Sequence, residues 1–326
     1  MNIVCKSNQA YTKSCPENLT AIMERNKIME YNKKKGAQGA QSTKGNPYQG
    51  KPKQHPASDR LDKYRAPKPP KREEPTIDEE MEDTGLVIGR NAVRELLKSD
   101  REIDKILVRR GDREGSIVVL VAQAIERGIP VVEVDKDKLD HMSGFAPHQG
   151  IVAMAAQKEY CTPEDILEIA RQRGEVPLIV IADGITDPYN LGALIRCAEG
   201  CGAHGLIIPK RRAVGLTPLV SKASAGAVEH LAIAKVANIG ATVRALKKEG
   251  VWVFAAEAGG KPYYETDFRG PCALVFGSEG NGVSDLVTKE ADIITSIPMY
   301  GKVNSFNVST AASVILAEAA KQHRQG

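Results

Sequence analysis

The chain has 326 residues, of which 42% are hydrophobic and only 5% aromatic, and its formal net charge is +4. This length accommodates two ordinary domains with additional segments, and the low aromatic content disfavours an all-β sandwich or barrel. No apolar run approaches the roughly 20 residues needed to cross a bilayer, and the first residues lack the charged and apolar parts of a signal peptide. We therefore expect a cytoplasmic α/β protein with no membrane partner.

The first 84 residues have the composition of a disordered tail. Residues 31–72 are rich in Gly, Pro, Gln and Lys and strongly basic, and an acidic stretch at residues 73–83 follows them. Such a segment offers little apolar surface to bury. It is either a solvated linker or a flexible polycation that extends contact with nucleic-acid phosphates. Met23 and Met29 are alternative start positions.

Residues 85–156 are predicted to form a small α/β unit. Short apolar runs predict strands at residues 86–88, 103–108, 131–134 and 150–155, and helical patterns fall at residues 91–98, 116–127 and 136–142. The next segment, residues 157–175, is expected to be a linker helix. Thr162 is placed to cap that helix, and Pro163 suits its first turn.

Residues 176–326 alternate apolar runs with helical patterns. The sequence indicates a parallel sheet covered on both faces, whose ligands bind at loops beyond the carboxyl ends of the strands. The predicted strands are residues 177–182, 205–208, 230–234, 251–255, 272–276 and 293–297, and the predicted helices are residues 190–198, 239–249, 284–289 and 308–323.

The six cysteines are scattered, with no C-x-x-C pair. In a chain of this length, that pattern predicts reduced thiols rather than a disulfide framework. Cys197 and Cys201 would share one face of a helix, but two thiols alone do not make a metal site. We therefore expect no bound metal.

Three loops that follow predicted strands carry unusual polar residues. The first contains Asn190 and, six residues later, Arg196, although a helix cap and a surface cation would also explain them. The second, at residues 276–282, holds Glu279 among glycines spaced G-x-x-G-x-G. This is not the G-x-G-x-x-G fingerprint, and it falls late in the domain, which argues against a nicotinamide site. The third loop carries Ser305 and Asn307 just before the last helix, where either could be a cap.

Together the three loops resemble the motifs of the SpoU/TrmH family of RNA ribose methyltransferases, in the SPOUT superfamily. The matching patterns are D-G-x-x-D-P-x-N-x-G-x-x-x-R, F-G-x-E-G-x-G and I-P-M-x-G-x-V-x-S-x-N-V-S, and residues 221–227 also resemble the family. The likeness covers residue 176 to the end. Residues 85–156 resemble the ribosomal-protein-like RNA-binding domain of the RlmB-like subgroup, which modifies 23S rRNA. Phe306 stands where the family usually has leucine.

The resemblance implies a trefoil-knotted, homodimeric enzyme that uses S-adenosylmethionine to methylate a ribose 2'-hydroxyl, in a guanosine of 23S rRNA. It points to RNA, within an assembling large subunit or free, and not to DNA. Arg196 would steady a phosphate or the developing alkoxide, with Glu279 orienting it, while the base stays open. The residues that match the family's catalytic set are Asn190, Arg196, Glu279, Ser305 and Asn307, and those that match its cofactor contacts are Gly277, Gly280, Ile297, Met299 and Phe306.

Two alternatives to an rRNA enzyme are a tRNA 2'-O-methyltransferase and an RNA-binding or assembly factor that has lost catalysis. The extra domain at residues 85–156 favours rRNA, and the retention of all five polar site residues disfavours an inactive factor. Residues 210–212, Lys-Arg-Arg, follow a strand end, where basic side chains meet phosphate or form a solvated loop.

Overall fold

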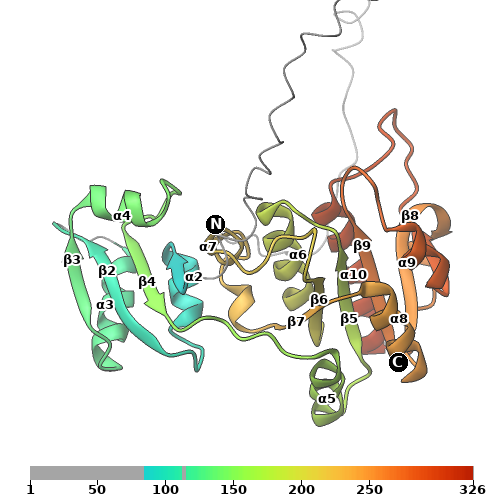
Figure 1. Ribbon diagram of the computed structural model, residues 1–326, viewed down its shortest axis with the longest axis horizontal. Coiled ribbons are helices and arrows are strands. Elements are labelled where there is room, and N and C mark those ends of the chain that lie inside the picture. The colour runs from blue at the N-terminus through green and yellow to red at the C-terminus, as the bar shows by residue number, and fades with distance from the viewer. Residues whose placement is uncertain (1–83, 112–114, 326) are drawn as a thin grey trace, which may run out of the picture. The chain divides into compact units, whose positions relative to one another are not determined.

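A computed structural model of the protein describes residues 84–111 and 115–325, which form two β-sheets, each with its own helices (Figure 1). The predicted tail lies outside the described residues except for Thr84, as do both alternative start positions. The α/β fold with a parallel sheet agrees with the prediction. None of the helices that the structure describes has the length and apolar content to span a bilayer.

The smaller sheet has four strands in the order β1-β4-β2-β3, and only the β2–β3 pair is parallel. Helices α2 and α3 pack on one face of this sheet, and α4 packs on the other. Its elements are β1 (Leu86–Ile88), α2 (Arg90–Leu96), β2 (Ile103–Arg109), α3 (Ser116–Glu126), β3 (Val131–Val134), α4 (Lys136–Met142) and β4 (Ile151–Ala155).

The larger sheet has six strands in the order β10-β8-β9-β5-β6-β7, and all of its neighbouring strands are parallel. Its elements, with the preceding helix, are α5 (Pro163–Arg173), β5 (Leu178–Asp183), α6 (Pro188–Gly200), β6 (Gly205–Pro209), α7 (Pro218–Ala223), η2 (Ala227–Glu229), β7 (Ala232–Val236), α8 (Ile239–Lys248), β8 (Trp252–Pro262), η3 (Tyr263–Glu265), β9 (Cys272–Gly277), α9 (Asp285–Glu290), β10 (Ile293–Ser296) and α10 (Val308–Gln325).

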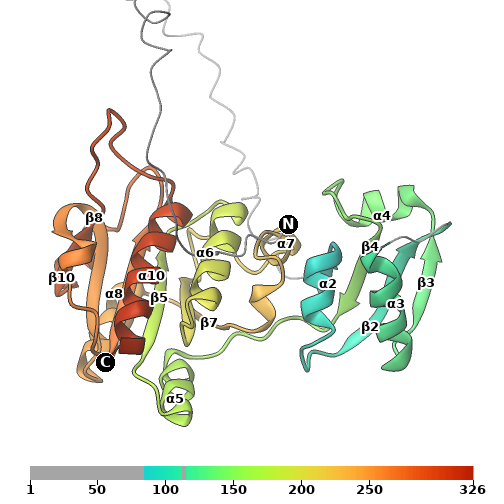
Figure 2. The same ribbon diagram turned by 180° about the vertical axis from the view of Figure 1, so that it is seen from behind.

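Alternation along the central strands creates two cores. In β5, Leu178 and Val180 face one side of the sheet, and Ile179 and Ile181 face the other. Because successive side chains of a strand point to opposite faces, a continuous apolar run requires cover on both sides. Helices α6 and α10 lie side by side on the first face (Figure 2), and α5, α8 and α9 supply apolar residues to the second.

The helix between the two sheets begins as its sequence predicts. The Thr162 hydroxyl accepts from the Asp165 amide at 3.2 Å, and the Asp165 carboxylate accepts from the Thr162 amide at 2.8 Å. Pro163 occupies the first turn, and Gly174 ends the helix in the left-handed conformation. This reciprocal cap satisfies backbone donors that the first turn leaves without partners inside the helix.

Helix α7 and the short helices η2 and η3 had no predicted counterpart, and two strands differ from the prediction. The strand expected at residues 230–234 begins at Ala232, because the short helix η2 precedes it and His230 is the C-cap of that helix. Strand β8 continues to Pro262 instead of ending at Ala255, and its register with β10 shifts between Ile294 and Thr295. The shift leaves residues 256–260 as a bulge between two paired stretches. These residues, Ala-Glu-Ala-Gly-Gly, carry no apolar pattern typical of a strand, so periodicity could not reveal this extension.

Candidate active site

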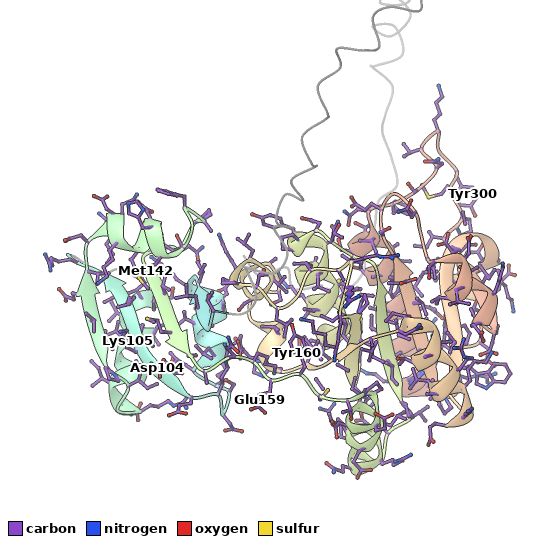
Figure 3. All side chains as sticks on the ribbon, in the orientation of Figure 1. Asp104, Lys105, Met142, Glu159, Tyr160 and Tyr300 are labelled. Atoms are coloured by element: carbon purple, nitrogen blue, oxygen red, sulfur yellow. The ribbon has the colours of Figure 1, made fainter. Side chains whose placement is uncertain are left out.

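The three polar loops lie at the carboxyl ends of β5, β9 and β10. Strands β5 and β9 are neighbours, and Asp183, the last residue of β5, pairs with Gly277, the last residue of β9. The β10–α10 loop, residues 297–307, returns to the same edge, and its Tyr300 is 90% exposed (Figure 3). The position agrees with the rule that parallel sheets bind ligands beyond their carboxyl ends.

One amide side chain connects these three loops. Asn307 Nδ2 donates to Asn190 Oδ1 at 3.0 Å and to Glu279 Oε1 at 2.6 Å. Its Oδ1 accepts from the amide and the hydroxyl of Ser309, which fixes the orientation of the group. Asn190 is buried in the first turn of α6, where its backbone amide donates to Asp187. Three of the five predicted catalytic residues therefore form one hydrogen-bonded chain.

The glycine loop after β9 folds tightly on itself. Ser278 and Gly282 exchange both of their backbone hydrogen bonds, at 3.1 and 2.9 Å. A Cβ atom on Gly277 would lie 1.9 Å from the carbonyl carbon of Gly282, and Gly282 itself has a φ of +66°. From the β8 bulge, the Glu257 carboxylate accepts a hydrogen bond from the amide of Val283. The loop thus requires glycine at two positions and is anchored by a carboxylate from a neighbouring strand.

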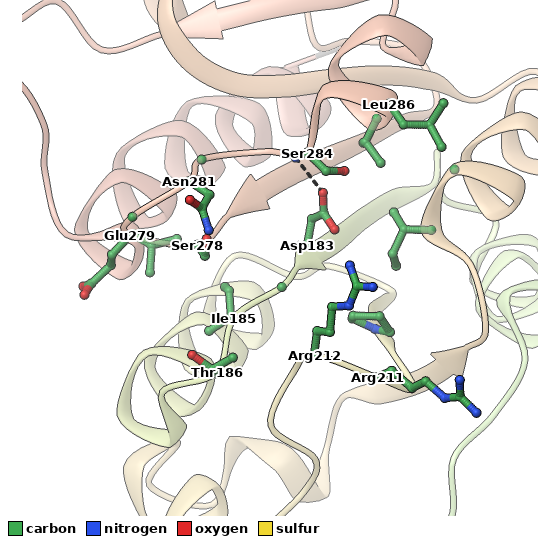
Figure 4. A pocket seen from close by; sticks show the side chains of 18 of the residues that line it. Asp183, Ile185, Thr186, Arg211, Arg212, Ser278, Glu279, Asn281, Ser284 and Leu286 are labelled. Carbon is green, nitrogen blue, oxygen red and sulfur yellow. Dashed lines mark hydrogen bonds between the residues drawn. The ribbon is translucent and has the colours of Figure 1, made fainter. Parts of the chain in front are cut away.

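Two cavities flank this loop. The first has a volume of about 770 Å³ and extends toward the ends of β6 and β7 (Figure 4). The second has a volume of about 830 Å³ and lies between the glycine loop and residues 295–306. The residues that line both cavities are Ser278, Glu279, Gly282 and Val308. The glycine loop is therefore the wall between two spaces of ligand size.

Four of the five predicted cofactor contacts line the second cavity. Gly277, Ile297, Met299 and Phe306 all border it, and Phe306 is 48% exposed. Gly280 borders the first cavity instead. The second cavity thus combines apolar side chains and glycine backbone with polar groups such as Thr295 and Ser296.

The remaining two predicted catalytic residues are placed differently. Ser305 is exposed and borders the second cavity. Arg196 is exposed on α6 and borders neither cavity. Among the hydrogen bonds and ion pairs of the described residues, the expected pairing of Glu279 with Arg196 is absent, and Glu279 accepts from Asn307. Six residues of helix carry Arg196 about 9 Å along the axis from Asn190 and onto another side of α6.

Several residues at the site were not predicted from the sequence. Glu257 was missed because it follows the last apolar residue of its strand. Asp183 ends β5, borders the first cavity and accepts from the Ser284 amide at 2.9 Å (Figure 4). Arg211 and Arg212, which the sequence assigned either to phosphate contact or to a solvated loop, border the same cavity. A charged residue directly after an apolar strand is the signal that could have identified Asp183.

Comparisons with known proteins agree with this arrangement. Residues 177–317 match the model of the SpoU rRNA Methylase family, and residues 86–161 match that of the RNA 2'-O ribose methyltransferase substrate binding domain. YacO of Bacillus subtilis (strain 168), named as a candidate TrmH family tRNA/rRNA methyltransferase, is 42% identical over 233 residues, covering 71% of this chain and 93% of its own. A similarly named protein of Staphylococcus aureus (strain MSSA476) is 41% identical over 250 residues, covering 76% and 99%.

Solved structures show the same fold. The AdoMet-bound rRNA methyltransferase of Sinorhizobium meliloti superposes with a TM-score of 0.60 at 25% identity, covering 72% of this chain and 86% of its own. The SpoU methyltransferase AviRb of Streptomyces viridochromogenes, in complex with AdoMet, gives 0.61 at 24% identity, covering 74% and 91%. With relatives above 40% identity over nearly their whole length, the chain belongs to the SpoU/TrmH family of RNA methyltransferases.

Proposed function

We propose that this protein transfers a methyl group from S-adenosylmethionine to the ribose 2'-hydroxyl of a guanosine in 23S rRNA. As a member of its family, the chain is an S-adenosylmethionine-dependent RNA methyltransferase. The proposal concerns which RNA it modifies and which nucleotide receives the methyl group. One observation carries the chemistry. Among the described residues, Glu279 is the single carboxylate that borders both cavities, so it stands between the two ligands.

The second cavity suits S-adenosylmethionine. Its volume lies within the range of cofactor sites, and its apolar wall at Ile297 and Phe306 can pack against an adenine ring. Glycine at position 277 lets the loop pack tightly on itself, because any Cβ there would collide with the backbone of Gly282, and the loop so folded forms one wall of this cavity. Gly277, Ile297, Met299, Phe306 and, at the loop tip, Gly280 are the proposed cofactor contacts. The cofactor supplies a methyl group on a sulfonium, which is activated toward an oxygen nucleophile.

Residues of the glycine loop prepare the acceptor. In the reaction the ribose oxygen forms a bond to the methyl carbon, the carbon–sulfur bond breaks, and the hydroxyl loses its proton. A protonated hydroxyl is a weak nucleophile, so a hydrogen-bond acceptor that takes the proton accelerates the step. We assign this role to Glu279, whose Oε1 accepts from Asn307. Asn190 and Asn307 hold the carboxylate in place, and Ser305 faces the cofactor side.

The role of Arg196 follows from the resemblance alone. Its exposed side chain is available to an RNA phosphate or to a second copy of this chain. We propose that the protein acts in the cytoplasm as a homodimer that places Arg196 of one copy near the site of the other.

We also propose a division into an RNA substrate-binding domain at residues 85–156, a linker helix at 157–175 and a catalytic domain at 176–326.

A tRNA substrate is the second candidate, because the relatives' names include both tRNA and rRNA. The substrate-binding match at residues 86–161 supports an RNA substrate and does not distinguish rRNA from tRNA. An inactive assembly factor is disfavoured, because such a protein has no need of a carboxylate held between two cavities.

The test is methyl transfer from labelled S-adenosylmethionine into unmodified 23S rRNA and bulk tRNA, followed by nucleoside analysis. We expect 2'-O-methylguanosine in 23S rRNA alone. Label in tRNA alone would overturn the substrate and keep the enzyme. Transfer to neither RNA, nor to a precursor of the large subunit, would contradict the proposal.

A further inference from the structure

We propose that the first cavity binds the RNA strand beside the modified nucleotide, with Arg211 and Arg212 contacting its phosphates. This inference rests on the proposed function and adds a subsite to it. The cavity reaches from Glu279 to the loop after β6, so one RNA strand could place a ribose at the glycine loop and a neighbouring phosphate at the arginines. Figure 4 shows both arginines across the cavity from Glu279, with Arg212 extending toward Asp183.

The acidic side chains that line the first cavity leave its two arginines available to bind a ligand. Asp183 accepts from the Ser284 amide, and Asp187 accepts from the Asn190 amide. Both carboxylates are therefore held by backbone donors, and the third carboxylate of the cavity, Glu279, accepts from Asn307. Across residues 84–111 and 115–325, neither Arg211 nor Arg212 has a side-chain hydrogen bond or ion pair, although both side chains border the cavity. A guanidinium that faces a cavity without an acceptor is suited to a phosphate, which it can bind through two parallel hydrogen bonds.

The backbone holds these arginines at the cavity. The amide of Lys210 donates to the Val236 carbonyl at 2.8 Å, which ties the loop to the end of β7. Arg212 has a φ of +58°, a left-handed conformation that costs energy for a residue with a side chain. Such strain persists only where surrounding contacts enforce it. The loop is therefore a defined structure and not a freely solvated turn.

The start of α8 strengthens the same electrostatic preference. Asn238 caps this helix by accepting from the Ala241 amide at 2.9 Å, and residues 238–240 border the cavity. Free backbone amides and the helix dipole at this end favour a negatively charged group. The two arginines and the helix end surround one part of the cavity, whereas the second cavity has none of these groups. The two spaces thus differ in the ligand that each can accept.

The experiment compares Arg211→Ala, Arg212→Ala, the double variant and Arg173→Ala, which removes an exposed arginine near the end of α5. Binding of full-length protein to unmodified 23S rRNA is measured over a series of salt concentrations, together with KM for RNA and the affinity for S-adenosylmethionine. We expect the double variant to raise KM for RNA about tenfold and to lower the salt slope by about 1 to 2, since each lost phosphate contact lowers it by about 1. Cofactor affinity should stay unchanged.

Arg211→Lys with Arg212→Lys keeps the charge but loses the forked geometry, and we expect an intermediate KM with nearly the wild-type salt slope. If the double alanine variant loses no more RNA affinity than Arg173→Ala, the subsite is overturned. A loss of cofactor affinity in place of RNA affinity would overturn it too. The binding measurement needs no turnover, so it stays decisive even if wild-type protein methylates neither RNA and the proposed function fails. Circular dichroism and thermal melting verify that each variant folds.

Discussion

Asn307 Nδ2 lies 2.6 Å from Glu279 Oε1 and 3.0 Å from Asn190 Oδ1, so one amide joins residues from three separate loops. A short hydrogen bond to a carboxylate is of the charge-assisted kind, about twice as strong as a neutral one. This bond holds Glu279 at the boundary between the two cavities. The arrangement makes the carboxylate the group whose removal is most informative.

Glu279→Gln should abolish most activity. The amide oxygen can still accept from Asn307, but it cannot take a proton from the ribose hydroxyl. We expect kcat to fall by about 10² to 10⁴, the range for general acid–base catalysis, with the affinity for S-adenosylmethionine changed less than threefold. Single-turnover methyl transfer and cofactor titration measure the two quantities. Retention of more than a tenth of wild-type kcat would exclude Glu279 as the proton acceptor.

Asn307→Asp tests the bridge between the loops. The substitution removes the N–H donor and places a second carboxylate against Glu279, so like-charge repulsion replaces a hydrogen bond. We expect kcat to fall at least tenfold, accompanied by weaker cofactor binding as the loops separate. Asn307→Ala, which removes the donor without adding charge, should be less damaging. Equal kcat values for the two variants would mean that charge repulsion is unimportant here.

Gly277→Ala and Gly280→Ala form a matched pair on the same loop. A Cβ on Gly277 would overlap the backbone of Gly282, whereas a Cβ on Gly280 meets nothing within 4 Å. We expect Gly277→Ala to lower the free energy of unfolding by about 2 to 4 kcal/mol. The variant should also abolish cofactor binding, because the loop must open to make room for the alanine side chain. The free energy of unfolding of Gly280→Ala should lie within about 0.5 kcal/mol of the wild-type value. Chemical denaturation and cofactor titration test both.

Arg196→Ala should eliminate turnover and leave cofactor binding intact, if Arg196 serves the site of a second copy. Mixing inactive Arg196→Ala and inactive Glu279→Gln proteins would then form hybrid dimers with one complete site. Random exchange restores about a quarter of the wild-type sites. The activity recovered on mixing measures how far Arg196 of one copy completes the active site of the other. Full activity of Arg196→Ala alone would remove the residue from the mechanism.

His323 should make stability depend on pH in mildly acidic solution. Burial lowers the pKa of this imidazole, whose Nε2 lies 3.5 Å from Cys272 Sγ, and the nearby His204 lowers it further. The unfolded chain therefore binds the proton more readily than the folded chain. The free energy of unfolding should fall as the pH drops below about 6.5 and through the lower folded pKa.

The variant His323→Gln removes this titration while keeping a polar side chain at the position. Denaturant unfolding of both proteins between about pH 5 and 8 measures the difference. We expect the variant to lose less stability than wild type over this range. Parallel curves for the two proteins would show that His323 does not account for the acid sensitivity.

Much of the architecture followed from local sequence patterns. The alternating burial of β5 and the reciprocal cap at Thr162 both depend on residues close together in the chain. Apolar runs and capping residues predict such features because their energetics are set within a few residues. The three loop motifs likewise predicted which segments meet, since the carboxyl ends of parallel strands share one edge of the sheet.

Only the tertiary structure decided which side chains touch. Asn307 and Asn190 are 117 residues apart, and no periodicity indicates that their amides bond to each other. The bulge that directs Glu257 to the glycine loop arises from a register shift between β8 and β10, which depends on pairing and not on composition. Arg196 shares a motif with Asn190, yet the turn of α6 carries it away from the cavities. Sequence specified the elements and their polar loops, whereas side-chain direction and long-range contact determined the site.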